Sequence, residues 1–180
     1  MPDKKIFESK IEPLWNKYQH KFRRLNEGEI SCMLKHMKAI EYISKSEFEF
    51  CLVLEDDAIP INSDYLKMIE DYVKDTPTNW DAIWMGFGCG LDFINDTLKR
   101  SKKVNEKIAK ISHPATNCTE AYLLKKESAC RIRDSLIPFQ LGSDFELAYQ
   151  FYKLNMNIYW LINPLFYQGS KTGTFKSEIR

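Results

Sequence analysis

The chain has 180 residues, 44% of them hydrophobic, which is enough to bury the core of one compact domain. Its 26 Lys and Arg residues nearly balance its 25 Asp and Glu residues, so net charge does not mark a binder of nucleic acid or of a membrane surface. We therefore expect a single domain over residues 1–180. Apolar residues at helical spacing predict an amphipathic helix from about Pro13 to a turn at Gly28, which makes residues 1–24 an N-terminal helical extension.

Five cysteines are spread along the chain without a Cys-x-x-Cys pair. This odd, scattered set argues against both a disulfide framework and a zinc site, and it predicts free thiols in a reducing compartment. No segment approaches the ~18 consecutive apolar residues of a membrane span, and the N-terminus leads into no apolar signal segment. The sequence thus predicts a cytoplasmic protein without a transmembrane segment. The cysteines are Cys32, Cys51, Cys89, Cys118 and Cys130.

A second apolar stripe predicts a helix from about Glu27 to Ser44, which Asn26 and Glu29 begin with a capping box. The continuous apolar run Phe50–Leu54 follows a charged stretch. Such a run is typical of a strand buried on both faces, as in a parallel sheet that helices cover. It ends abruptly in three acidic residues.

Helices and strands continue to alternate in the rest of the chain. A helix capped by Asn62 or Ser63 precedes a strand at Trp80–Gly86, and Leu91–Lys110 is predicted to be a long loop with short strands. This alternation predicts an α/β layered fold with a mostly parallel central sheet. The remaining predicted elements are a strand at 121–124, a helix at 126–135, a helix capped by Ser143 or Asp144, and a strand at 158–162.

The triplet Glu55-Asp56-Asp57 stands where an apolar strand ends, the place at which open α/β sheets bind ligands. It can be read simply as a polar turn. However, three adjacent carboxylates repel one another, and a divalent cation would offset that repulsion. Mg²⁺ and Mn²⁺ are held by one or two carboxylates together with substrate phosphates, so the triplet is a candidate metal and nucleotide site.

The chain resembles glycosyltransferase family 25, the lipooligosaccharide galactosyltransferases and their relatives. The resemblance rests on Gly28-Glu29-Ile30 with Cys32 and His36, followed by Leu52-Val53-Leu54 and the acidic triplet. It extends over about residues 25 to 179. Further matches lie, in order, at Trp80, Asp81, Thr119, Ala121, Tyr122, Leu123, Ala129, Asp144, Leu147, Pro164, Gln168, Ser177 and Ile179.

This resemblance implies a GT-A-type fold, a UDP-sugar donor with galactose as the first choice of sugar, and inversion at the anomeric carbon. The acceptor would be a glycan, a lipooligosaccharide or a glycoprotein. By analogy with the acidic motif of that fold, Asp57 is expected to bind Mn²⁺ or Mg²⁺. Glu55 and Asp56 are expected to contact the donor nucleoside.

Inverting transfer in one displacement also needs a base for the acceptor hydroxyl. Asp144 is the candidate base, with Glu146 as the second choice. Glu29 and His36 are candidate donor contacts, although a helical His is as often a buried boundary residue. Two further sets are more simply structural: His113 as a loop residue, and Trp84, Phe87, Trp160, Phe166 and Tyr167 as core aromatics instead of a sugar platform.

Two departures from the family pattern leave an alternative open. Only 27 residues precede Gly28, so the family's usual first strand is not visible, and Lys35 stands where the pattern has Ser. The alternative is a non-catalytic, glycosyltransferase-like binding or scaffold protein. A metal-dependent nuclease is disfavoured because the chain lacks a basic track.

Overall fold

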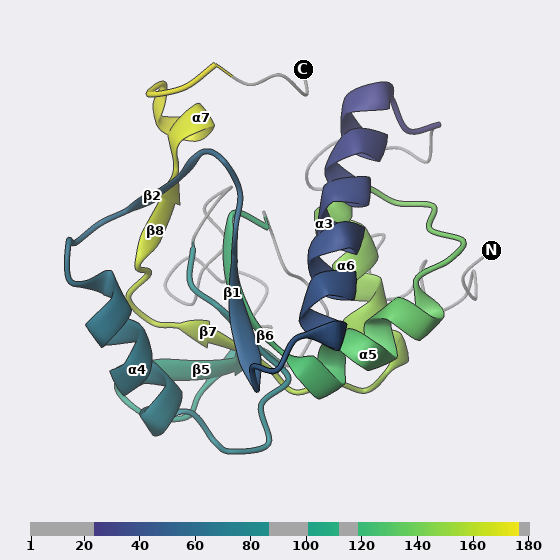
Figure 1. Ribbon diagram of the computed structural model, residues 1–180. Coiled ribbons are helices and arrows are strands. Elements are labelled where there is room, and N and C mark those ends of the chain that lie inside the picture. The colour runs from purple at the N-terminus through teal and green to yellow at the C-terminus, as the bar shows by residue number, and fades with distance from the viewer. Residues whose placement is uncertain (1–23, 87–100, 112–118, 177–180) are drawn as a thin grey trace.

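A computed structural model describes residues 24–86, 101–111 and 119–176 (Figure 1). Most of the helix expected from Pro13 lies outside these residues, and Gly28 lies in the first turn of a helix instead of in a turn between two helices. The elements are α3 (Glu27–Lys45), β1 (Phe50–Leu54), β2 (Ala58–Pro60), α4 (Tyr65–Asp75), β3 (Ala82–Trp84), β4 (Ser101–Lys103), β5 (Ile108–Ile111), β6 (Ala121–Lys125), α5 (Lys126–Ser135), α6 (Ser143–Lys153), β7 (Ile158–Leu161), β8 (Phe166–Gln168) and α7 (Gly169–Thr172).

Helix α3 confirms the helix and the capping box predicted from the sequence. The Asn26 side chain accepts a hydrogen bond from the Glu29 amide at 2.8 Å, and the Glu29 carboxylate accepts one from the Asn26 amide at 2.9 Å. Two other predicted caps are wrong. Asp64, not Asn62 or Ser63, precedes α4 and makes no side-chain cap, and α6 begins after Gly142.

The main sheet has six strands in the order β1-β6-β3-β7-β5-β4. Only β3 and β7 pair in parallel, so the prediction of a mostly parallel sheet is wrong. Strands β1, β3 and β7 nevertheless run in one direction. The sheet is mostly antiparallel because two strands run in the opposite direction. Strand β6 inserts between β1 and β3, and β5 pairs with β7.

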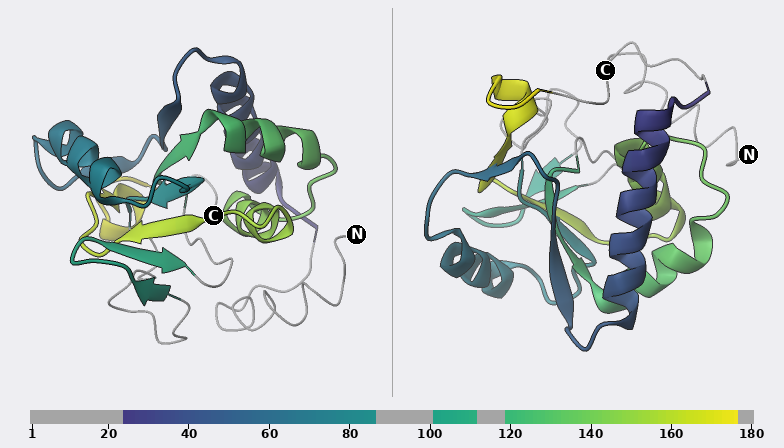
Figure 2. Two further views of the ribbon diagram at one scale, coloured as in Figure 1. Left: turned by 90° about the horizontal axis from the view of Figure 1, so that it is seen from below. Right: turned by 45° about the horizontal axis from the view of Figure 1, so that its top comes forward.

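The sheet is the middle layer of three. Helices α3, α5 and α6 cover one face and α4 covers the other, as Figure 2 shows from below. Side chains alternate between the two faces along each strand. Tyr122 and Leu124 of β6 thus pack under α3 and α5, whereas Leu123 packs on the α4 side. Within the described residues, no helix is both long and apolar enough to cross a membrane.

Strand β1 is an edge strand, contrary to the expectation that it is buried on both faces. Among the described residues it pairs only with β6 in the sheet, its first four residues are half-buried, and Leu54 is 43% exposed. The position at the edge explains how the strand delivers three carboxylates without burying them all. Beyond it, β2 pairs with β8 in a separate two-stranded sheet, with Ala58 opposite Gln168.

Candidate functional site

A cavity of about 640 Å³ opens where β1 ends. One wall is α3, another is the acidic triplet, and a third is formed by the end of β8 with the segment after it. The triplet therefore follows a strand and faces a cavity, as its sequence position predicts, although the strand is at the edge of the sheet. The polar and charged residues lining the cavity are Ser31, Cys32, Lys35, His36, Glu55, Asp56, Asp57, Gln168, Ser170 and Lys176.

Main-chain pairing brings these walls together. Because β1 and β6 are antiparallel, the residues that follow β1 lie beside those that precede β6. The Glu55 amide donates to the Glu120 carbonyl at 2.9 Å, which places Thr119 next to the triplet. On the other side, the Gly169 amide donates to the Asp57 carbonyl at 2.8 Å and holds the end of β8 against the triplet.

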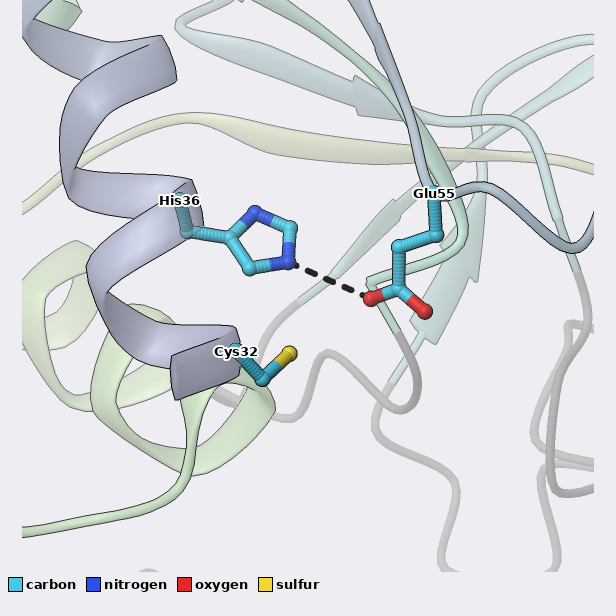
Figure 3. Close-up of side chains that lie close together, drawn as sticks. All are labelled: Cys32, His36 and Glu55. Carbon is cyan, nitrogen blue, oxygen red and sulfur yellow. Dashed lines mark hydrogen bonds and ion pairs between the residues drawn. The ribbon is translucent and has the colours of Figure 1, made fainter. Parts of the chain in front are cut away.

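His36 and Glu55 form a buried pair that links α3 to the end of β1 (Figure 3). The His36 Nε2 lies 3.2 Å from a Glu55 carboxylate oxygen, and the Nδ1 lies 3.0 Å from the Tyr122 hydroxyl. The Thr119 hydroxyl donates to the same Glu55 oxygen at 2.5 Å. The side chain of His36 is 4% exposed and that of Glu55 is 19% exposed. His36 is thus a buried residue that also borders the cavity.

The pair stays charged despite its burial. Burial by itself would lower the pKa of His36, but Tyr122, Cys32 and Glu55 outweigh it and raise this pKa to about 11. Burial by itself would also raise the pKa of Glu55. Hydrogen bonds from His36 and Thr119, with the positive charge of His36, instead lower it. Glu55 is therefore an ionised carboxylate whose acceptor capacity is partly used within the protein.

These shifts predict how the metal-free protein responds to pH. The Glu55 contribution to stability is present above the unfolded pKa of 4.5 and is lost as pH falls through its lowered folded pKa. The His36 contribution is complete below 6.5 and is lost as pH rises toward about 11. We expect the difference in unfolding free energy between wild type and His36→Gln to be largest between pH 4.5 and 6.5, where both contributions are complete. The difference should shrink at lower and at higher pH. Urea unfolding in EDTA across pH measures this difference, and a constant difference from 5 to 10 would contradict it.

Asp57 lines the cavity and has one buried carboxylate oxygen without a hydrogen bond among the described residues. Its Oδ2 accepts from the Ser170 amide at 3.2 Å, whereas its buried Oδ1 meets no donor among the described residues. The buried Oε1 of Gln168 likewise meets no donor in the described part of the chain. Both side chains line the cavity, and an acceptor buried without a donor is costly. Two such oxygens fit a hard cation, which binds oxygen ligands.

A family model for glycosyltransferase family 25, described as an LPS biosynthesis protein, matches residues 2–147. The match spans well over half of the chain and includes the acidic triplet. The chain belongs to glycosyltransferase family 25. This assignment confirms the resemblance seen in the sequence and indicates a glycosyltransferase of lipopolysaccharide biosynthesis. No curated protein matches the chain.

The other candidate residues of this family 25 protein lie in different places. Glu29 is engaged in the capping box and does not line the cavity. Asp144 lies in the first turn of α6, and its Oδ1 accepts from the Phe145 amide at 2.9 Å. It does not line the cavity either, although the adjacent Ser143 contacts Thr119. Glu146 is 3% exposed and accepts hydrogen bonds from two loop amides and a neighbouring amide side chain.

Some expectations concern the core or residues outside the described ranges. Trp84, Trp160 and Phe166 are at most 2% exposed, which confirms them as core aromatics, and Tyr167 is half-buried. Phe87 and His113 lie outside the described residues. Cys32, Cys51 and Cys130 are free thiols, as predicted, whereas Cys89 and Cys118 are not described.

Sequence reasoning missed several groups that border the triplet. Thr119 and Ser143 are common polar residues that only the tertiary fold brings together, 3.4 Å apart. Gln168 and Lys176 come from the last part of the chain. Gln168 appeared in the family pattern without a role. No local signal marked it, because the short strand that ends at Gln168 was not predicted from the sequence.

Proposed function

We propose that this family 25 protein is a metal-dependent, inverting glycosyltransferase that moves a sugar, with galactose as the first candidate, from a UDP-sugar to a glycan or lipooligosaccharide acceptor. The observation that carries the proposal is that two residues lining the cavity, Asp57 of the acidic triplet and Gln168, each have a buried acceptor oxygen without a donor among the described residues. These oxygens suit Mn²⁺ or Mg²⁺, whose remaining ligands are commonly substrate phosphates.

The residues of the cavity have separate roles in this proposal. Asp57 and Gln168 hold the cation, which would stabilise the negative charge that develops on the diphosphate leaving group. Lys35 and Lys176 line the same cavity and add positive charge for the diphosphate. Asp56 is exposed at the cavity and is the free member of the triplet for donor contacts. Glu55 is proposed as a second donor contact, although its carboxylate is also paired with His36.

The volume of the cavity supports a nucleotide-sized ligand. Small-molecule sites typically occupy about 300–1,000 Å³, and the cavity of about 640 Å³ falls within that range. Its lining combines carboxylates, lysines and the aromatic ring of Phe175. This mixture offers groups for a metal, for phosphates and for an apolar ring face, which are the parts of a nucleotide-sugar complex.

The test is hydrolysis of a panel of UDP-sugars by the full chain, with Mn²⁺, with Mg²⁺ and with EDTA. We expect UDP release that requires a divalent cation and is fastest with UDP-galactose. UDP binding in Mn²⁺ without release from any donor would instead support a non-catalytic binding protein. The absence of both UDP binding and turnover would contradict a nucleotide-sugar function.

We propose Asp144 as the base that takes the proton of the acceptor hydroxyl, although it lies outside the lining of the cavity, and Asp144→Asn tests it. Asn is accepted in the first turn of a helix but cannot take up the proton, so we expect transfer to fall by roughly 10²-fold. Donor binding, measured by UDP titration, should stay unchanged. The alternative is a structural role at the start of α6, since the Asp144 carboxylate accepts a hydrogen bond from the Phe145 amide. Wild-type transfer rates in the variant would assign Asp144 to that structural role.

A further inference from the structure

Three groups that bind transition metals converge at the inner wall of the cavity (Figure 3). They are the Cys32 thiol, the His36 imidazole and the Glu55 carboxylate, and their ligand atoms all lie within 4.8 Å of one another. Cys32 and His36 are four residues apart on α3, so they share one face of the helix. Glu55 approaches that face from the end of β1. Figure 3 shows the sulfur, the ring nitrogen and the carboxylate directed toward a common point.

We propose that Cys32, His36 and Glu55 form a binding site for Zn²⁺, distinct from the site for a hard cation at Asp57. Zinc is held by sulfur, imidazole nitrogen and carboxylate oxygen, which is the mixture present here. Mn²⁺ and Mg²⁺ prefer oxygen ligands, so a thiolate and an imidazole select against them. The inference stands on this cluster alone and does not depend on glycosyl transfer.

The distances leave room for an ion. Ligand atoms that lie about 2.0–2.3 Å from a tetrahedral zinc ion are about 3.3–3.8 Å from one another. The His36 Nε2 and the Glu55 oxygen are already 3.2 Å apart. A small rotation of the half-buried Cys32 side chain would complete the set. The ion would replace the proton that joins His36 to Glu55 and the proton of the Cys32 thiol, and both protons would be released to solvent.

Each of the three groups is oriented by a second hydrogen bond, as ligands of metal sites usually are. The Tyr122 hydroxyl lies 3.0 Å from His36 Nδ1, which leaves Nε2 to face the cluster. The Thr119 hydroxyl donates to Glu55, and the Ser143 hydroxyl lies 3.3 Å from the Cys32 sulfur.

These supporting residues come from β6, from the segment before it and from α6. Three separate elements thus fix the cluster in place.

The cluster supplies three protein ligands and borders the cavity. Zinc sites with three protein ligands keep a fourth position for water or for a bound molecule. In this protein that position would belong to water or to an oxygen of a ligand in the cavity. Zinc binding would also take Glu55 away from any contact with the donor.

The experiment titrates the full chain, stripped of metal with EDTA and transferred to metal-free buffer, with Co²⁺ as a spectroscopic substitute for Zn²⁺. A cobalt–thiolate bond gives a charge-transfer band in the near ultraviolet, and we expect one Co²⁺ per chain with this band. Added Zn²⁺ should remove the band, whereas Mg²⁺ should not. Zinc affinity then follows from competition with a chromophoric chelator.

Cys32→Ser should abolish the band and weaken Zn²⁺ binding by roughly 100-fold or more, since even residues that only orient a ligand cost about 10–100-fold. Cys51→Ser and Cys130→Ser are matched controls, because both thiols are free and half-buried but outside the cluster. They should keep the band. Asp57→Asn should also keep it, which separates this site from the proposed catalytic cation.

Alkylation followed by mass spectrometry gives a second readout on the wild-type protein. Zn²⁺ should protect Cys32 from alkylation and leave Cys51 and Cys130 reactive. This measurement needs no variant, so it stands even if Cys32→Ser fails to fold. Absence of the cobalt–thiolate band in wild type, its survival in Cys32→Ser, or protection of other cysteines in place of Cys32 would overturn the proposal.

Discussion

Asp57→Asn is expected to reduce metal-dependent transfer by about 10²-fold or more while the protein remains folded, because removal of a major charge-stabilising group typically costs about 10²–10³ in kcat. Asp57 lines the cavity, and its buried Oδ1 meets no donor in the described part of the chain. The substitution keeps the shape of the side chain and halves its capacity as a cation ligand. It also relieves repulsion within the triplet, so the metal-free melting temperature should stay equal or rise.

The measurements are donor hydrolysis in Mn²⁺ and direct Mn²⁺ binding by electron paramagnetic resonance. Gln168→Glu is the second variant. It replaces the neutral side-chain oxygen of Gln168 with a second carboxylate, and Gln168 pairs with Ala58, the residue after Asp57. We expect this variant to bind Mn²⁺ more tightly and to lose stability without the ion. Wild-type turnover and Mn²⁺ affinity in Asp57→Asn would remove Asp57 from the cation site.

Glu146→Ala is expected to lower the free energy of unfolding by about 3–5 kcal/mol, since it leaves several buried donors without their charged acceptor. The Glu146 carboxylate is 3% exposed and receives the amides of Gln140 and Leu141 at 3.0 and 3.2 Å. Its other oxygen accepts from Gln150 Nε2 at 2.8 Å. This one side chain therefore fixes the segment between α5 and α6 to the start of α6.

Urea unfolding of the full chain measures the effect, with Glu127→Ala as the control. Glu127 is an exposed acid in the first turn of α5, so its removal should change stability by no more than about 0.5 kcal/mol. A Glu146 variant with wild-type stability but without transfer activity would instead support a direct chemical role for Glu146. That outcome would restore it as a candidate base.

Local sequence signals predicted helices α3 to α6 and strands β1, β3, β6 and β7, but not β2, β8 or α7. Helix α5 spans Lys126–Ser135 as expected, and the spacing of Asn26 and Glu29 correctly marked the start of α3. Such signals act within a few residues, through caps and through one apolar face per helix. The alternation of helices and strands predicted one direction for β1, β3, β6 and β7, but β6 runs antiparallel to the other three. The order in which the strands pair could not be predicted, because no local pattern in β6 shows that it inserts between β1 and β3.

The candidate site likewise has a part that local sequence signals predicted and a part that depends on the tertiary fold. The triplet was predictable because it directly follows an apolar strand, where α/β sheets bind ligands, and the end of that strand borders a cavity as expected. The cluster of Cys32, His36 and Glu55 was not predictable, and the absence of a Cys-x-x-Cys pair argued against a zinc site. Its spacing along the chain is not that of a zinc motif, since only the meeting of α3 with the end of β1 places Glu55 beside Cys32 and His36.

The ladder between β2 and β8 joins residues that are far apart along the chain, with Ala58 opposite Gln168. A ribosome adds roughly 5–20 residues per second, so Asp57 leaves the ribosome several seconds before its partner strand does. During that interval α3, β1 and α4 can form, but the cavity lacks the wall that carries Gln168 and Ser170. The cavity is therefore closed only after β8 has been made. A shortened protein ending before β8 would retain many core residues but would lack the cavity wall that carries Gln168 and Ser170.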